Sequence, residues 1–362
     1  MRITKFRVSN LRIFSEAELT PSPHLNLIVG PNASGKTSLL EGIHLLAVAR
    51  SFRTPRISEV IRHGSERVAV RGEVEKTDDH VVELKVEKGR HYTRLKAGGK
   101  RVKSTSELAT HLPVVAITPD SHNILHGGPR ERRRLLDWTL FHVEHGYLPA
   151  WHSYQRALRQ RNRLLRQKGG IAEMAAWEAE MAQFARIIHT ARRDCVAQLA
   201  VPFAAWTESL GLKHLSLRYS PGWDQELELA ATLRGRRVED MTAGTTRVGP
   251  HRADIRIAQE TVGAAASVSR GQSKLVVAAL LAANVTWLGI QKRIQPVLLV
   301  DDFGAELDAR SRAKLGELIA ALGMQTFVTT TSLDQLPNGT KWRGLSSQMF
   351  HVKQGVVKPE MI

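Results

Sequence analysis

A glycine-flanked segment, Gly30 to Thr37, has residue types and a spacing that bind nucleotide phosphates. It reads GPNASGKT and fits the pattern G-x-x-x-x-G-K-[ST]. In such a loop the glycines let the backbone turn until successive N–H groups face the phosphates, the lysine reaches the β and γ phosphates, and the threonine hydroxyl binds Mg²⁺. The sequence therefore predicts a site for a nucleoside triphosphate and Mg²⁺, with a catalytic role for Lys36. We expect the nucleotide to contact Gly30, Pro31, Asn32, Ala33, Ser34, Gly35, Lys36, Thr37 and Ser38.

Two adjacent aspartates, Asp301 and Asp302, end an apolar run far along the chain. A phosphate loop needs a carboxylate at the end of a neighbouring strand to orient the metal and its water. We expect Asp301, together with Thr37, to serve the metal, and Asp302 to act as the base or to position water. Lys36 and Asp301 are 265 positions apart, far more than one βαβ unit requires. A large insertion must therefore separate the two halves of one site.

The segment Ser269-Arg270-Gly271-Gln272 stands before the aspartates and opens an apolar helix. It resembles the signature S-G-G-Q of ABC-type ATPases, with Arg270 in place of the first glycine. A serine hydroxyl and free N–H groups at a helix N-terminus form an anion site, although a helix cap is the structural alternative. We expect Ser269, with Gly271 and Gln272, to complete the nucleotide site of a second subunit, so that ATP holds a homodimer together. Asp308 follows as the acid of a D-loop.

Hydrophobic periodicity predicts the elements that position these residues. We expect strands over residues 2–8, 25–29, 67–75, 81–86, 92–95, 112–117, 212–219, 255–257, 297–300 and 326–330, of which 67–75, 81–86 and 92–95 form an antiparallel meander. Helices are expected over 38–49, near 271–283 and over 311–322. Residues 129–203 are almost wholly helical, with a turn at Lys168 to Gly170.

This order, with the phosphate loop and the signature segment, predicts an α/β fold, a P-loop NTPase of the ABC type. Its lobe I receives an inserted, mainly helical lobe II. We place lobe I at residues 1–122 and 286–362, and lobe II, which carries the signature segment, at residues 123–285.

The charge balance points to a polyanion as partner. Lysine and arginine number 52 against 35 acids, a net charge of +17, and the commonest polyanion in a cell is nucleic acid. The helical insertion carries much of this charge, and side chains three or four residues apart share one helical face. We expect DNA backbone contacts from Arg130, Arg132, Arg133, Arg134, Arg156, Arg159, Arg163 and Arg166.

Other assignments remain open for the basic side chains. The arginines of the insertion could form a solvated helix face, and Lys96, Lys100, Arg101 and Lys103 form a competing patch in a probable hairpin. His251 and Arg252 either touch phosphate or the dimer interface, or belong to a structural turn. Few aromatic residues lie among the basic ones, which argues against a base-stacking platform for single strands.

The remaining composition excludes several classes of protein. Cys195 is the only cysteine, so no intrachain disulfide forms. The longest apolar stretch, residues 275–290, is interrupted by Asn284 and Thr286 and is shorter than the roughly 20 residues that span a bilayer. We expect a buried helix there and a cytoplasmic protein without a membrane anchor. The histidines lack metal-ligand spacing, so we expect no metal besides Mg²⁺.

At this point the chain resembles the RecF family of bacterial recombination mediators nearly end to end. Asn10 to Phe14 is similar to the family's N-F-R-N-Y segment, and Gly249 to Asp254 is similar to its G-P-H-R-D-D run, except that Ala253 replaces one acid. Residues 39–53, 118–120, 127–137 and 297–308 also resemble the family. Ala33 and Ala305 depart from the usual glycine and serine, which leaves the rate of hydrolysis open.

The resemblance implies a head similar to those of SMC and Rad50 but without their coiled coils. It also implies ATP-dependent dimerisation, slow and DNA-stimulated hydrolysis for release, and binding to gapped, junction or duplex DNA. The same resemblance implies that the protein works with RecO and RecR to load RecA at gaps and takes part in SOS induction. It places Arg12 among the nucleotide-binding residues.

One alternative is an SMC-like DNA organiser, which would need heptad arms that the sequence lacks. Another is a transporter ATPase subunit, which would need a much shorter gap between the phosphate loop and Asp301. A P-loop kinase is the third, and it explains neither the signature segment nor the charge.

Overall fold

The computed structural model describes residues 1–362 apart from 77–79, 213, 260–261, 338–344 and 361–362. The chain forms two compact units. Unit 1 consists of Met1–Ser121, Arg270–Val285 and Arg293–Ile362, and unit 2 of His122–Ser269 and Thr286–Lys292. Residues 270–285 were expected in lobe II and residues 286–292 in lobe I. Compact units need not coincide with functional lobes, so the lobe bounds stay a prediction.

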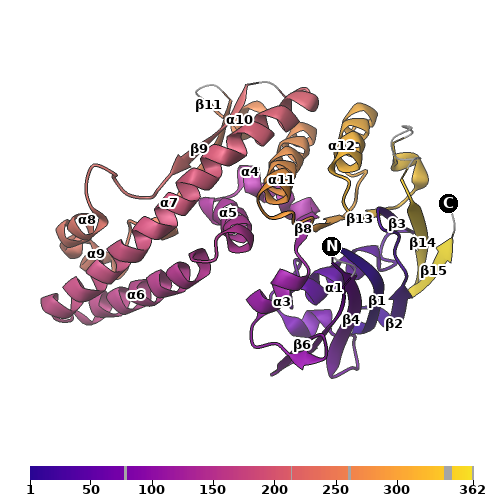
Figure 1. The fold of residues 1–362 in the computed structure, drawn as a ribbon, viewed down its shortest axis with the longest axis horizontal. Coiled ribbons are helices and arrows are strands. Elements are labelled where there is room, and N and C mark those ends of the chain that lie inside the picture. The colour runs from indigo at the N-terminus through magenta and orange to yellow at the C-terminus, as the bar shows by residue number, and fades with distance from the viewer. Residues whose placement is uncertain (77–79, 213, 260–261, 338–344, 361–362) are drawn as a thin grey trace. The chain divides into compact units, whose positions relative to one another are not determined.

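Unit 1 contains two six-stranded sheets (Figure 1). The first is antiparallel and has the order β2-β1-β4-β5-β6-β7. Its strands are β1 Arg2–Leu11, β2 Phe14–Leu19, β4 Arg67–Glu75, β5 Val81–Gly89, β6 Thr93–Ala97 and β7 Lys100–Arg101. Every second side chain of β4 is buried, as the period of two predicts for a sheet with one covered face. The antiparallel meander is therefore confirmed.

The second sheet of unit 1 has the order β15-β14-β3-β13-β12-β8, in which only β15 runs antiparallel to its neighbour. Its strands are β3 Leu25–Val29, β8 Val114–Ile117, β12 Val297–Val300, β13 Thr326–Thr330, β14 Ser347–Lys353 and β15 Val356–Glu360. All residues of β3, β12 and β13 are buried, as expected for parallel strands that are covered on both faces, although β3 contains Asn26 and β13 contains three threonines. The predicted bounds of these three strands are confirmed.

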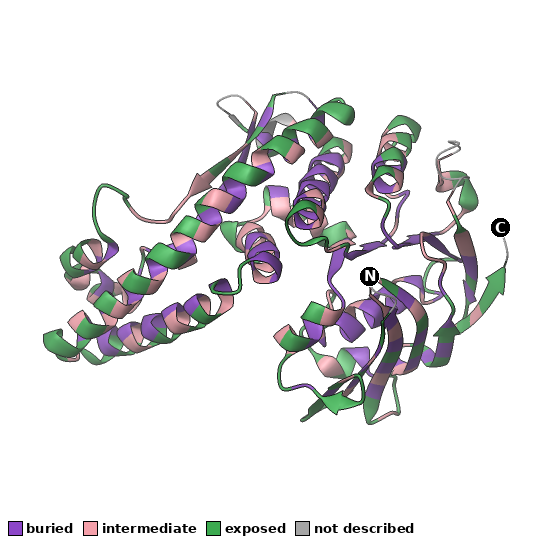
Figure 2. Ribbon diagram, in the orientation of Figure 1, coloured by how far each residue is buried: buried purple, intermediate pink, exposed green. Residues whose placement is uncertain are grey.

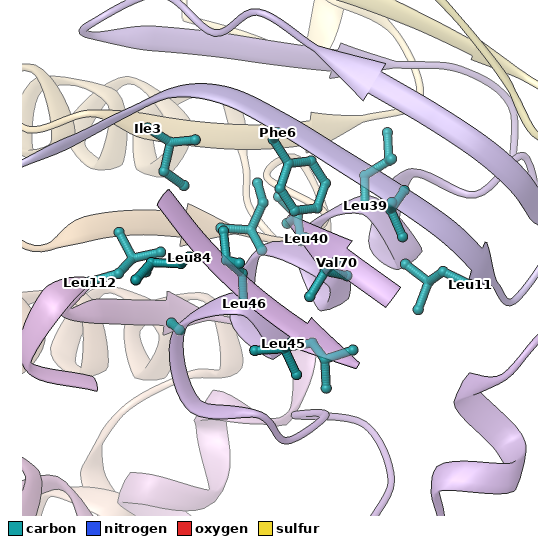
Figure 3. Close-up of a cluster of buried hydrophobic side chains, with 14 of the residues drawn as sticks. Ile3, Phe6, Leu11, Leu39, Leu40, Leu45, Leu46, Val70, Leu84 and Leu112 are labelled. Carbon is teal, nitrogen blue, oxygen red and sulfur yellow. The ribbon is translucent and has the colours of Figure 1, made fainter. Parts of the chain in front are cut away.

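Helix α1, Lys36–Val48, is fixed by a core that it shares with the antiparallel sheet (Figure 3). Fully burying a leucine side chain contributes about 1.5–3 kcal/mol, so its leucines hold the start of the helix firmly behind the loop that precedes it. The side chains that meet in this core include Leu39, Leu40, Leu45 and Leu46 of α1 and Ile3, Phe6, Leu11, Val70 and Leu84 of the sheet. The other helices of unit 1 are α2 Ile57–Val60, α3 Thr105–His111 and α12 Ala309–Leu322.

Unit 2 is mainly helical, as expected for the insertion (Figure 1). Lys168 adopts a left-handed conformation after α6, which confirms the predicted turn. The helices are α4 Asn123–His126, α5 Pro129–Val143, α6 Tyr147–Gln167, α7 Ile171–Ser209, α8 Leu229–Gly235, α9 Arg237–Ala243 and α10 Ala264–Ser267. A three-stranded sheet has the order β11-β10-β9, with β9 Leu215–Ser220, β10 Asp254–Gln259 and β11 Val262–Gly263. Short 3₁₀ turns cover Pro119–His122, where the chain passes from unit 1 to unit 2, Pro250–Arg252 in unit 2, and Leu333–Gln335 in unit 1.

A buried ion-pair network joins the helices of unit 2. Arg161 of α6 is fully buried and donates hydrogen bonds to Glu178 of α7 at 3.1 Å and to Asp240 of α9 at 2.8 Å. Its remaining donors meet the Thr246 hydroxyl at 2.7 Å and the Leu233 carbonyl at 3.0 Å. Because a buried charge is tolerated only when it is paired and hydrogen-bonded, this arginine is structural. It is not a surface for DNA.

The apolar helix α11, Arg270–Lys292, crosses from unit 1 into unit 2. Its length and composition alone would suffice to cross a membrane, but 78% of its most apolar window is buried inside the protein. Figure 2 shows most of this ribbon in the colour of buried residues. These findings agree with the buried helix that the sequence predicts.

Candidate nucleotide-binding site

The turn between β3 and α1 depends on two glycines. Gly35 has φ 112° and is the N-cap residue of α1, where it offers no side chain to the helix, so the N–H groups of the first turn have no partner within the helix. A Cβ on Gly35 would come within 2.6 Å of Phe14, and a Cβ on Gly30 would collide with the carbonyl oxygen of Val352. Ala33 adopts φ 61°, a left-handed conformation in which glycine would avoid steric strain.

Two side chains show how the turn suits phosphate oxygens. Lys36 curls over the loop and donates from Nζ to the carbonyls of Gly30 at 2.7 Å and Pro31 at 2.9 Å. Burial lowers the pKa of this ammonium, against the opposing attraction of Asp302 and Asp301. The buried hydroxyl of Ser34 has no hydrogen-bond partner among the described residues. An orphaned hydroxyl, a lysine and a helix N-terminus together fit an anionic ligand.

The loop and the first aspartate meet although they are distant in sequence. The Thr37 hydroxyl donates to Asp301 Oδ1 at 2.8 Å across a separation of 264 residues. Asp301 follows β12, and β13 lies between β12 and β3 in the sheet, so the carboxyl ends of these strands bring the two side chains together. Burial raises the pKa of Asp301, while its hydrogen bonds from Thr329 and Thr37 oppose the increase. These oxygens are the ligands that Mg²⁺ prefers.

Thr329 on β13 is a site residue that the sequence reasoning missed. Its hydroxyl donates to Asp301 Oδ1 at 2.7 Å and accepts from the backbone N–H of Asp302 at 2.8 Å. One side chain therefore holds both aspartates. Asp302 itself adopts a left-handed backbone with φ 53°. No sequence motif marks Thr329. Its role follows from the pairing of β13 with β12, which places its side chain next to Asp301.

The comparisons with known proteins cover nearly the whole chain. The family model for the RecF/RecN/SMC N terminal domain matches residues 2–355. The protein named DNA replication and repair protein RecF from Azotobacter vinelandii is 41% identical over 359 residues, which cover 98% of each chain. The chain belongs to the RecF family. The RecF of Stutzerimonas stutzeri is 40% identical over 99% of this chain and 97% of its own.

Solved structures agree with this family assignment. A structure of the recombination mediator protein RecF with ATP, in the RecFOR pathway, is 26% identical, with a TM-score of 0.86 over 99% of this chain and 97% of that one. An Smc head domain from Pyrococcus furiosus is 17% identical, with a TM-score of 0.60 over 99% of this chain and 95% of that one. The second likeness shows the fold alone and confirms the expected SMC-head type.

In this RecF-family chain, the signature residues lie where α11 begins. Ser269 is exposed and immediately precedes α11, whereas Gly271 and Gln272 lie in its first turn. Ser269 belongs to unit 2 and the start of α11 to unit 1. Asp308, the expected D-loop acid, caps α12: its carboxylate accepts from the Ser311 N–H at 2.6 Å, and this hydrogen bond lowers the pKa of Asp308.

Arg12 is anchored to the helix that follows the phosphate loop. It adopts φ 50° and donates two hydrogen bonds to the fully buried carboxylate of Glu41 on α1, at 2.9 and 2.8 Å. Ser51 also donates to Glu41, and Arg53 lies 3.9 Å from it. Because Glu41 holds its guanidinium, the Arg12 side chain is fixed against α1, the helix that follows the phosphate loop. The sequence does not reveal Glu41 as its partner.

The basic residues of the RecF-type insertion divide into two groups. Arg132 is 12% exposed, pairs with Asp254 at 2.8 Å and donates to the carbonyl of Gly127 at 2.9 Å, while Arg133 donates to the carbonyl of Ala253 at 2.6 Å. These two therefore hold the turn before β10, and the expectation that they contact DNA does not suit their geometry. The other six arginines that the sequence predicts to contact DNA are exposed: Arg130, Arg134, Arg156, Arg159, Arg163 and Arg166.

His251 belongs to a structural turn. Its Nδ1 lies 2.7 Å from the Tyr154 hydroxyl, and its Nε2 lies 3.0 Å from the Thr246 carbonyl. Burial lowers its pKa to about 4, so the ring is neutral at pH 7. Of the two readings that the sequence left open, the structural turn fits His251. Arg252 beside it is exposed.

Proposed function

We propose that this RecF-family chain acts in DNA replication and repair as an ATP-dependent DNA-binding protein. The observation that carries the proposal is the contact between Thr37 and Asp301, which completes one phosphate and metal site from segments 264 residues apart. RecF relatives cover 98% of the chain, and one solved RecF holds ATP. ATP with Mg²⁺ is therefore the ligand that this site fits best.

Each residue of the site receives a role from its position. Backbone N–H groups of the loop and of the first turn of α1, together with the Ser34 hydroxyl, bind phosphate oxygens, and Lys36 contacts the β and γ phosphates. Thr37 and Asp301 hold Mg²⁺, which when bound neutralises phosphate charge. Asp302 positions the attacking water or accepts its proton, and Arg12, which Glu41 fixes against α1, contacts the nucleotide. Turnover is slow and DNA-stimulated, so that binding dominates over catalysis.

A second copy of the chain completes the site. Ser269, Gly271 and Gln272 supply a hydroxyl and helix N-terminal N–H groups, which suit the γ phosphate bound by a partner, and Asp308 lies at the same interface. ATP thereby closes a homodimer on gapped, junction or duplex DNA, and hydrolysis opens it. RecO and RecR are the partners implied by the RecFOR pathway, and the resemblance to the family adds RecA and a part in SOS induction. We place the protein in the cytoplasm.

Replacing Thr329 by valine tests the metal half of the site. Valine keeps the shape but removes the hydroxyl that holds Asp301 and Asp302. Loss of such an outer contact weakens metal sites by about 10- to 100-fold, and we expect the half-saturating Mg²⁺ concentration for ATP hydrolysis to rise about tenfold. Thr326→Val, on the same strand but bonded to the Met324 carbonyl, is the control. Equal half-saturating Mg²⁺ concentrations for Thr329→Val and Thr326→Val would show that the Thr329 hydroxyl has no role in the metal site.

DNA-stimulated ATPase at two salt concentrations tests the function as a whole. Contacts between arginines and backbone phosphates release counterions, so they weaken steeply as salt rises. We expect duplex or gapped DNA to stimulate hydrolysis at low salt and the stimulation to fade at high salt. Hydrolysis that is indifferent to DNA at both concentrations would contradict the proposal.

The proposed DNA surface makes a separate prediction. Losing two phosphate contacts should flatten the slope of log affinity against log salt by about 1.8. We expect this change for Arg159→Gln with Arg163→Gln on the exposed face of α6. The matched control is Lys100→Gln with Arg101→Gln in the exposed β6–β7 hairpin. If only the hairpin pair changes the slope, the competing patch binds DNA and the α6 assignment is wrong.

A further inference from the structure

Lys274 of α11 contacts the loop that carries the second aspartate. It is half-buried, and its ammonium donates to the carbonyls of Asp302 at 3.0 Å, Phe303 at 3.4 Å and Ala305 at 3.2 Å. An ammonium has three donors, and three carbonyls converge on it here. The roles of Lys36, Thr37, Asp301 and Asp302 in the phosphate and metal site do not require a lysine at position 274.

The loop that Lys274 holds has an unfavourable backbone. Asp302 and Glu306 both adopt left-handed conformations, with φ 53° and 63°, and such residues persist only where their surroundings fix them. On one side, Thr329 fixes the loop through the N–H groups of Asp302 at 2.8 Å and Phe303 at 3.0 Å. On the other side, the Lys274 ammonium donates to the carbonyls of Asp302, Phe303 and Ala305. The backbone position of Asp302 therefore depends on both contacts.

The charge of Lys274 matters as well as its length. Burial lowers the pKa of this lysine, while the nearby carboxylates of Asp302, Glu306 and Asp301 oppose the decrease. A cation between these acids and the carbonyl dipoles offsets their mutual repulsion. An uncharged chain of the same length would fill the space without this effect.

A second contact links the same two segments. A Cβ added to Gly271 would lie 3.3 Å from the carbonyl oxygen of Glu306, so the first turn of α11 packs closely on the end of the loop. Gly271 belongs to the signature segment, and Lys274 follows it by three residues on the same helix. The start of α11 therefore contacts both ends of the loop of residues 302–306: Lys274 contacts Asp302, and Gly271 packs on Glu306.

From these contacts we infer that Lys274 is a positioning residue that couples the signature segment to Asp302. The inference rests on the proposed function. When the signature residues of one copy meet the triphosphate held by its partner, α11 transmits the contact through Lys274 to the carboxylate in its own site. Occupancy of one site in the dimer thereby sets the geometry of the other.

Lys274→Met tests this inference, because methionine keeps an unbranched chain and removes the ammonium. We expect kcat for Mg-ATP hydrolysis with DNA to fall at least about tenfold, while KM, the Kd for ATP and the ATP-dependent dimer change less than about threefold. Lys274→Arg, which keeps the charge but has a planar group that fits three converging carbonyls less well, should recover part of kcat. The control is Lys292→Met at the exposed end of the same helix.

The possible outcomes separate this inference from the proposed function. Normal kcat in Lys274→Met, loss of ATP affinity in proportion to kcat, or loss of the dimer would each overturn the coupling role, provided that the unchanged chain dimerises and hydrolyses ATP. If the unchanged chain does neither, the proposed function fails and the inference with it. Should Lys274→Met lose cooperative thermal unfolding, Lys274→Gln is measured under the same criteria.

Discussion

Lys36→Arg is expected to lower ATP turnover by about 100-fold, the usual order of effect for losing one group that stabilises developing charge on a transferring phosphoryl group. The Lys36 ammonium fits between two carbonyls of its own loop, at 2.7 and 2.9 Å. A guanidinium keeps the charge but is larger and planar, so it cannot occupy the same place against the phosphates. Some ATP binding should survive, because the backbone N–H groups of the loop remain.

Steady-state hydrolysis and equilibrium binding of ATP measure the two effects of Lys36→Arg separately. Lys358→Arg, at an exposed position on β15, is the matched control and should keep both values. Turnover in Lys36→Arg equal to that of the unchanged chain would exclude this loop as the catalytic phosphate site.

Ser269→Arg should abolish the ATP-dependent dimer and leave ATP affinity within about threefold, since its effect falls on the interface rather than on the loop that binds ATP. Ser269 is exposed at the start of α11, and the proposed partner triphosphate approaches this end of the helix. A long cationic side chain would fill that space and displace the helix N–H groups from the phosphate.

Light scattering with and without ATP, together with ATP titration, distinguishes the interface effect from loss of binding. Ser209→Arg introduces the same side chain at another exposed serine, near the end of α7. Dimers that persist in Ser269→Arg would refute the role of the signature segment across subunits. Loss of dimers in both variants would show a nonspecific effect of added charge.

The sequence predicts the parts of the site that are local in the chain. The phosphate loop is eight consecutive residues, and two short, mainly apolar strands, β3 and β12, end at functional residues. Their periodicity and composition determine the structure within a few residues of each motif. The α/β class and the helical insertion follow from the same patterns.

The contacts that complete the site could not be predicted in this way. The contacts of Thr329 with Asp301 and Asp302, of Glu41 with Arg12, and of Lys274 with residues 302–305 span 27 to 31 positions in the chain. Threonine, glutamate and lysine are common residue types and carry no motif here. Which strands and helices become neighbours decides these contacts, and a single sequence does not specify that order. The hairpin of β14 and β15 escaped prediction because its periodicity is weak.

Charge alone also gave an incomplete account of the insertion. Arg132 and Arg161 read as members of a basic stretch, yet each is engaged by carboxylates inside unit 2. Every guanidinium nitrogen of Arg132 and Arg161 donates to a carboxylate, a carbonyl or a hydroxyl inside unit 2, so neither side chain is available to a phosphate. Sequence counts cannot separate the two uses, whereas exposure and hydrogen bonding do.

Sedimentation of the unchanged chain with saturating ATP and Mg²⁺, with and without duplex DNA, tests the composite nucleotide site most directly. The proposal predicts a shift from one protomer to two when nucleotide is added, and its reversal as ATP is hydrolysed. Single protomers under every condition, at concentrations where ATP binding is complete, would contradict it.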